Sequence, residues 1–107
     1  MCSSDLSVTK ALAALEKNHL PPVVMVDASH ANCAKDCERM PATFREILAQ
    51  RAAGTRGIIG AMLESNLVAG AQSLGKDRGK LVYGQSITDQ CIDWATTEQL
   101  VREAAAL

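Results

Sequence analysis

Two short apolar runs constrain the fold of this chain more than any other feature. In Val23–Val26 and in Gly57–Leu63, apolar residues occupy both sets of alternate positions, so a strand formed by either run would be apolar on both faces. This pattern is typical of parallel strands covered on both sides, whereas half-exposed antiparallel strands alternate between apolar and polar residues. The runs therefore predict two buried parallel strands.

Helical periodicity surrounds these runs. Apolar residues repeat at helical spacing from Ser7 to Asn18, and a second stripe extends from Cys33 to Leu48. Pro41 lies inside the second stripe, so the helix either begins there or is kinked. A last amphipathic helix is expected to finish the chain around Leu100–Leu107, and the capping-box pattern of Thr96 with the glutamine three residues later would start it.

A long glycine-containing connection separates the second strand from the last helix. Such loops are usually functional. Within it, Ser86–Asp89 has roughly the form of a helix start, whereas Gly70–Gly75 lacks the context of a phosphate-binding loop. Tyr83 and Trp94 either line a pocket or, as we expect, anchor the loop on the core.

The order of these segments predicts a parallel α/β fold. Two parallel strands alone leave both sheet edges unpaired, so we expect them to belong to a larger sheet or barrel. A complete (β/α)₈ barrel needs roughly 250 residues, so this chain of 107 residues is too short for one, and its two predicted strands would make about a quarter of the eight β/α units.

Charge and hydropathy limit the partners. Eleven Lys and Arg against twelve Asp and Glu give a net charge of −1, without a basic stripe for a phosphate backbone. No apolar run approaches the roughly 20 residues that cross a bilayer, and the first residues lack the features of a signal peptide. We therefore expect a cytoplasmic protein that binds neither nucleic acid nor membrane.

His30 and Glu64 follow the two predicted strands, where parallel α/β folds place their active sites. By strand alternation His30 shares a face with Val26, and if that face points into a barrel, the imidazole meets Glu64 above its core. Asp89 in the long loop adds a second carboxylate. One imidazole and two carboxylates suit Mn²⁺, Fe²⁺, Co²⁺ or Zn²⁺. The alternative is a capped strand end with solvated loop charges.

The four cysteines (Cys2, Cys33, Cys37 and Cys91) are expected to be thiols, because the chain shows no export signal. Cys33 and Cys37 could form a metal or redox site with His30, but their spacing fits buried positions on one helix face better. Cys91 is expected to be more exposed and has no assigned role.

Three blocks of sequence carry a specific resemblance. They read DASHAN at residues 27–32, IIGAMLESNLVAGAQSL at 58–74 and YGQSITDQCIDW at 83–94. In this order and spacing they resemble the carboxyl-terminal end of type I 3-deoxy-D-arabino-heptulosonate 7-phosphate (DAHP) synthase, from about Leu20 onward. The resemblance implies that residues 1–107 are part of a (β/α)₈ barrel domain, about its last two β/α units.

The resemblance also implies an activity. DAHP synthases condense phosphoenolpyruvate with erythrose 4-phosphate in the first step of the shikimate pathway, and a Cys, a His, a Glu and an Asp hold their divalent metal. The last three correspond to His30, Glu64 and Asp89, with catalytic roles for His30 and Asp89. Asp27 and two neighbouring polar residues, Ser29 and Asn32, are candidate supporting groups. The parent enzyme is expected to be a homo-oligomer.

The chain departs from the family pattern in part. The Cys ligand and the cationic segments that bind the two phosphorylated substrates belong to upstream regions, and Cys2 does not stand in a matching context. Ala71, Gln85 and Asp93 replace residues usual in the loop. We therefore expect the 107 residues alone to be inactive. A small non-catalytic α/β binding or interaction module derived from the barrel remains the alternative.

Overall fold

The computed structural model describes residues 3–30 and 36–107 of the chain. Within these residues, helices and strands alternate, as the sequence pattern predicts. In chain order they are α1 (Ser3–Lys17), β1 (Val24–Asp27), α2 (Met40–Ala52), β2 (Ile58–Met62), the short 3₁₀ helix η2 (Arg78–Lys80) and α3 (Trp94–Ala105). The α/β class is therefore confirmed for this part of the chain.

The two strands form a parallel sheet. Met25 pairs with Gly60 and Asp27 with Met62, after a shift in register that follows Val24. Helix α2 makes the crossover between the strands. Because parallel strands place their carboxyl ends at the same edge of a sheet, the residues that follow β1 and β2 lie close together.

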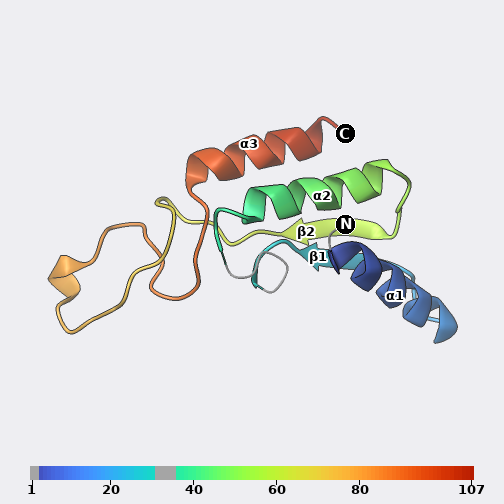
Figure 1. The fold of residues 1–107 in the computed structure, drawn as a ribbon, viewed down its shortest axis with the longest axis horizontal. Coiled ribbons are helices and arrows are strands. Elements are labelled where there is room, and N and C mark those ends of the chain that lie inside the picture. The colour runs from blue at the N-terminus through green and yellow to red at the C-terminus, as the bar shows by residue number, and fades with distance from the viewer. Residues whose placement is uncertain (1–2, 31–35) are drawn as a thin grey trace.

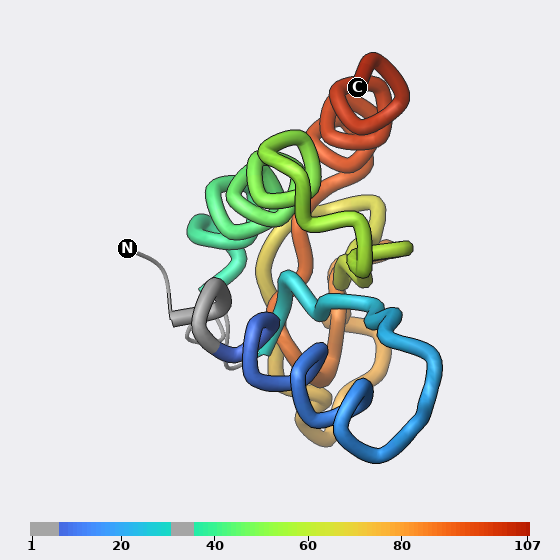
Figure 2. The backbone as a smooth tube through the Cα atoms, turned by 90° about the vertical axis from the view of Figure 1, so that its right-hand side faces the viewer, coloured from blue at the N-terminus to red at the C-terminus, as the bar shows by residue number. Residues whose placement is uncertain are grey.

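Helices α1, α2 and α3 lie around the two strands (Figure 1), and one core cluster joins Val8 of α1 and Phe44 of α2 to Val26 and Ile58 of the strands. Helix α1 contacts β1, α2 contacts β2, and α3 lies along α2. Figure 2 shows α2 and α3 as neighbours from a second direction. The core is mostly aliphatic: Met40, Ile47 and Leu100 are at most 1% exposed, and Phe44 is buried beside them at 5%.

The strands also present large apolar side chains to solvent. Met25 is 68% exposed and Ile59 is 63% exposed. For the described residues the expectation that both faces of the strands are buried is therefore wrong, because the helices bury Val26 and leave Met25 and Ile59 exposed.

Strand alternation does not predict the direction of His30. It places His30 on the face of Val26 and Ala28, but both of these residues are buried in the core shared with the helices. Strand β1 ends at Asp27, and His30 has a φ of 51°, so the alternation does not extend to it. A turn after the strand sets its direction instead.

The helix ends decide between the two alternatives at Pro41 and correct two further expectations. Helix α2 begins at Met40 with Pro41 in its first turn, so the proline starts the helix and does not kink it. Helix α3 begins at Trp94, capped by Asp93, whose Oδ1 accepts a hydrogen bond from the backbone N–H of Thr96 at 2.8 Å. Thr96 is therefore inside the helix and not its cap, and Ser86–Asp89 is not helical.

The segment between β2 and α3, residues 63–93, projects away from the helices as an excursion with η2 at its tip (Figure 1). Isolated bridges join its two arms, one of them between Gly70 and Cys91. The side chain of Gln72 donates to the carbonyl oxygens of Val82 and Gln85, at 2.8 and 3.0 Å, and accepts from the N–H of Val82. These bonds order the base of the excursion.

The two aromatic residues near the excursion do not anchor it on the core. Tyr83 is 88% exposed, and Trp94 is 58% exposed. That expectation is therefore wrong, and hydrogen bonds across the base hold the excursion instead. Among the described residues, no helix combines the length and the apolar character that crossing a membrane requires.

Candidate metal site at the strand ends

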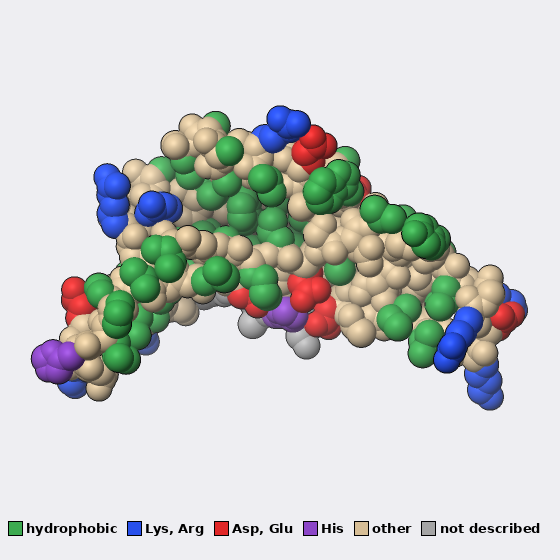
Figure 3. Space-filling view, turned by 180° about the vertical axis from the view of Figure 1, so that it is seen from behind, with side chains coloured by type: hydrophobic (Ala, Val, Ile, Leu, Met, Phe, Trp, Pro, Cys, Tyr) green, Lys and Arg blue, Asp and Glu red, His purple; other side chains and the backbone are tan. Residues whose placement is uncertain are grey.

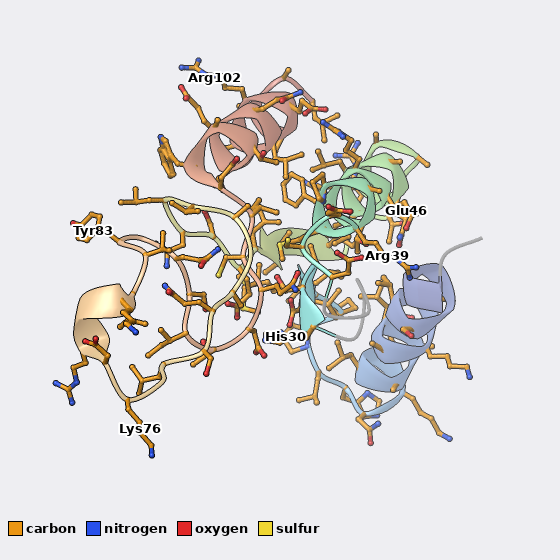
Figure 4. All side chains as sticks on the ribbon, turned by 60° about the vertical axis from the view of Figure 1, so that its left-hand side comes forward. His30, Arg39, Glu46, Lys76, Tyr83 and Arg102 are labelled. Atoms are coloured by element: carbon orange, nitrogen blue, oxygen red, sulfur yellow. The ribbon has the colours of Figure 1, made fainter. Side chains whose placement is uncertain are left out.

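The three residues selected from the sequence lie together at the carboxyl ends of the strands. His30 Nε2 is 3.2 Å from Glu64 Oε1 and 3.1 Å from Asp89 Oδ2. One possible ligand atom from each residue lies within 4.8 Å of the other two. Figure 3 shows histidine and acidic side chains at the concave margin of the molecule, and Figure 4 places His30 at the end of β1.

A tight turn after β1 positions His30. The carboxylate of Asp27 contacts His30 Nδ1 at 2.8 Å and accepts a hydrogen bond from the backbone N–H of Ser29 at 2.7 Å. The φ of 51° at His30 lies in the left-handed region, which few residues other than glycine adopt. These contacts accompany a backbone conformation that directs the ring across to the end of β2.

Two backbone contacts hold Glu64. Its N–H donates to the hydroxyl oxygen of Ser29 at 2.9 Å, and its carbonyl oxygen accepts from the N–H of Ile92 at 3.0 Å. Ser29 is 1% exposed, so its hydroxyl joins the two strand ends inside the protein. Glu64 is thereby tied both to the turn after β1 and to the chain entering α3.

The base of the excursion positions Asp89. The backbones of Gly70 and Cys91 exchange two hydrogen bonds, of 2.8 and 3.1 Å. On the other side, Ser86 Oγ accepts from the N–H of Thr88 at 3.1 Å and turns the chain just before the aspartate. Asp89 is therefore held between the turn at Ser86 and the backbone pair at Cys91, although its side chain is the most exposed of the three site residues at 47%.

The acidic neighbours change the proton affinity of His30. The hydrogen bond to Asp27 is the largest cause that raises the pKa of the imidazole, and the negative charges of Asp27, Glu64 and Asp89 add to it. A positive charge is thus favoured at the centre of the three carboxylates. Either a proton on the ring or a bound cation would supply it.

Two of the three separations between the donor atoms match the geometry of a divalent transition metal. Two ligand atoms that each lie about 2.1 Å from one ion, at octahedral or tetrahedral angles, are about 3.0–3.4 Å apart. The 3.1 and 3.2 Å separations from His30 Nε2 fall in this range. Imidazole and carboxylate donors suit Mn²⁺, Fe²⁺, Co²⁺ and Zn²⁺, so the set does not select among them.

Cys91 is a neighbour of this site that the sequence did not reveal. It is 5% exposed, so the expectation of a more exposed thiol is wrong. Its Sγ lies 3.8 Å from Glu64 Oε2, and burial raises the pKa of the thiol. Its position two residues after Asp89, next to the apolar Ile92, is the only signal in the sequence that could have indicated this burial.

The other cysteines do not join the site in the described residues. Cys37 lies in the turn before α2, where its N–H donates to Gln90 Oε1 at 3.2 Å and its side chain packs against the core. It is therefore not on the helix. Cys33, the other half of the alternative cysteine site, lies outside the described residues, as do Cys2 and Asn32.

A parallel α/β unit with polar groups gathered at its strand ends is the arrangement used by α/β enzymes. The chain belongs to the DAHP synthetase I family, whose model matches residues 2–102. It is 43% identical over 100 residues to the Tyr-sensitive phospho-2-dehydro-3-deoxyheptonate aldolase of Escherichia coli K12, covering 94% of this chain. It is 47% identical over 89 residues to the phospho-2-dehydro-3-deoxyheptonate aldolase of Corynebacterium glutamicum, covering 78% of this chain.

A solved structure agrees with this family. The phospho-2-dehydro-3-deoxyheptonate aldolase of Francisella tularensis SCHU S4 superposes with a TM-score of 0.85 and 37% identity over 92% of this chain. The chain spans 28% of that structure, 28% of the Escherichia coli protein and 24% of the Corynebacterium protein. The resemblance recognised from the sequence is thus confirmed at the level of the family.

Proposed function

We propose that this chain forms the strand-end metal site of a DAHP synthase, a transferase that joins phosphoenolpyruvate to erythrose 4-phosphate. Water is consumed, and DAHP and phosphate are released. The observation that carries the proposal is the convergence of His30, Glu64 and Asp89 in a chain of this family. The site would belong to the parent enzyme of the route to aromatic amino acids.

The two β/α units would be the last part of a (β/α)₈ barrel. The exposed Met25 and Ile59 support this, because a barrel would cover the strand surfaces that the helices of this chain leave open. The position of the cluster also supports it, since (β/α)₈ enzymes have their active sites at the carboxyl ends of the strands. Residues 1–107 are on this proposal a partial barrel domain.

His30, Glu64 and Asp89 would hold a divalent metal whose chemistry is that of a Lewis acid toward the aldehyde of erythrose 4-phosphate. Neutral His30 would offer Nε2, and the two carboxylates would balance the positive charge. Asp89 has the most exposed side chain of the three and lies on the excursion, so it would face the incoming aldose. His30, which would offer Nε2 to the metal, and Asp89, which would face the aldose, are therefore the proposed catalytic residues.

The rest of the parent enzyme would have to supply the groups that bind phosphate. Lys76 lies on the excursion, and Figure 4 shows it far from His30. Two multiply charged substrates need cationic partners, so the described residues would contribute metal binding and not substrate phosphate binding. Assembly of the parent enzyme as a homo-oligomer stays a prediction.

Mn²⁺ binding to the 107-residue chain tests the site directly. His30→Asn should lower the affinity for Mn²⁺ at least 10-fold, measured by calorimetry or by the electron paramagnetic resonance signal of free Mn²⁺. The matched control is His19→Asn. His19 is exposed and has a φ of 60°, and asparagine tolerates this conformation at both positions. Equal Mn²⁺ affinity in the two variants would contradict the ligand assignment.

A chimera tests the activity. Residues 2–102 would replace the matching segment of the Escherichia coli Tyr-sensitive protein, and phosphate release from phosphoenolpyruvate with erythrose 4-phosphate would be measured. We expect turnover in the chimera and its loss with His30→Asn, but not with His19→Asn. A folded chimera that binds Mn²⁺ without turnover would favour the non-catalytic module.

A further inference from the structure

We propose that Asp27 is a positioning residue that orients the ring of His30 and sets its tautomer, so that Nε2 faces Glu64 and Asp89 without a proton. This inference rests on the metal site proposed above and adds to it a residue that acts through His30. Asp27 is the last residue of β1, so the sheet fixes its backbone immediately before the turn.

Both oxygens of the Asp27 carboxylate are engaged at once. Oδ1 accepts from the backbone N–H of Ser29 at 2.7 Å, and Oδ2 contacts His30 Nδ1 at 2.8 Å. A carboxylate held at both oxygens has little rotational freedom. The ring of His30 is therefore oriented by a group that is itself fixed to the end of the strand.

Two other turns in the chain show that one oxygen is enough for the turn itself. Asp36 Oδ1 accepts from the N–H of Glu38, and Asp77 Oδ1 accepts from the N–H of Gly79, both at 2.9 Å. These are the same aspartate turns as at Asp27 and Ser29, but neither contains a histidine. The second oxygen of Asp27 thus has a use that the turn does not require.

The chemistry of a carboxylate decides the tautomer. An ionised carboxylate can only accept hydrogen bonds, so the His30 nitrogen that it contacts must carry the proton. Nε2 also faces carboxylate oxygens, at 3.1 and 3.2 Å, but the contact of Nδ1 with Asp27 is shorter, at 2.8 Å. In the neutral ring, which has a single proton, Nδ1 is therefore the donor, and Nε2 keeps a lone pair directed at Glu64 and Asp89. That is the tautomer that can offer Nε2 to a cation, and a carboxylate behind a metal-binding imidazole raises its basicity.

The same carboxylate also reaches the second strand end. Asp27 holds the backbone of Ser29, and the hydroxyl of Ser29 accepts from the N–H of Glu64 at 2.9 Å. This branch uses only Oδ1. A variant that keeps Oδ1 and changes the other atom therefore separates the effect on the ring from the effect on the turn.

Asp27→Asn is this variant. The amide oxygen can still accept from Ser29, but the amide nitrogen faces Nδ1 as a donor. Nδ1 must then become the acceptor, so the proton moves to Nε2 and the lone pair is lost on the side of the carboxylates. Asp77→Asn is the matched control, because it makes the same change in a turn without a histidine.

The experiment measures two quantities on the full chain. Nitrogen-15 spectra of the imidazole, recorded where the ring is neutral, report the tautomer of His30, with the exposed His19 as an internal reference. We expect the Nδ1–H tautomer in the unchanged chain and in Asp77→Asn, and the Nε2–H tautomer in Asp27→Asn. The affinity for Mn²⁺ should fall about 10- to 100-fold in Asp27→Asn alone, with the circular dichroism spectrum unchanged.

The outcomes separate this inference from the proposed function. The Nδ1–H tautomer together with unchanged Mn²⁺ affinity in Asp27→Asn would overturn it, since a purely structural turn predicts that result. If the unchanged chain binds no Mn²⁺, the proposed metal site fails, while the tautomers still report on Asp27. If Asp27→Asn unfolds the turn, Asp27→Glu supplies the second test. Where the glutamate carboxylate keeps the Nδ1–H tautomer of His30, the affinity for Mn²⁺ must be kept as well.

Discussion

The two histidines of this chain show how context gives different meanings to one backbone conformation. His19 and His30 have φ values of 60° and 51°. At His19 this conformation ends α1, because the N–H of His19 donates to Glu16 and the N–H of Leu20 donates to Leu15, the hydrogen bonds of a Schellman motif. At His30 it directs the ring toward two carboxylates. Only the second conformation builds a site.

Gly57 carries a prediction at this scale. A Cβ atom at this position would lie 2.6 Å from Leu12 Cδ2 and 2.7 Å from the carbonyl oxygen of Pro22. Since backbone cannot move aside cheaply, Gly57→Ala should lower the free energy of unfolding by about 1–3 kcal/mol in urea denaturation. Gly60→Ala is the control, because its Cβ meets only the flexible end of Met25, at 3.0 Å. Equal losses in both variants would contradict close packing of α1 at Gly57.

At the scale of elements, the sequence predicted what depends on periodicity and missed what depends on single hydrogen bonds. The parallel strands and the meeting of His30 with Glu64 follow from apolar patterns and from the geometry of parallel sheets. The start of α3 does not, because Asp93 and Thr96 are both good caps and the sequence alone does not rank them. The turn at Asp27 likewise depends on local hydrogen bonds, which strand alternation does not predict.

The cap of α3 predicts how stability depends on pH. The hydrogen bonds from Thr96 lower the pKa of Asp93, so the folded state holds the ionised form more strongly than the unfolded state. This contribution is present above the unfolded pKa and is lost as the pH falls through the folded pKa. Asparagine caps about as well but has no charge.

We therefore expect Asp93→Asn to have a lower Tm than the unchanged chain near neutral pH. The difference should shrink as the pH falls from neutral to about 3, because protonation of the aspartate removes the contribution of its charge. Thermal unfolding followed by circular dichroism at both pH values measures it. Asp93→Ala, which removes the cap, should lower the Tm at every pH. If the difference in Tm between the unchanged chain and Asp93→Asn did not change with pH, the contribution of the charge would be contradicted.

At the scale of the whole molecule, the shape is elongated. The radius of gyration is 16.1 Å, with extents of 52 × 30 × 23 Å. A compact domain of this length would have a radius of about 13 Å. The excursion at one end accounts for much of the difference (Figure 1). An open sheet, long extents and a surface with many apolar side chains together favour contact with further protein.

The last prediction concerns this open surface in solution. Met25 and Ile59 are more than half exposed on a sheet that has two strands in the described part of the chain, and open sheets with exposed apolar side chains associate. Light scattering after gel filtration should therefore give at least twice the 11.4 kDa of one chain at high concentration. The double variant Met25→Lys, Ile59→Lys should shift the population toward the monomer, because association would bury two charges. Leu74→Lys on the excursion is the control and should leave the mass unchanged. If only Leu74→Lys gave monomers, the excursion and not the sheet would be the contact.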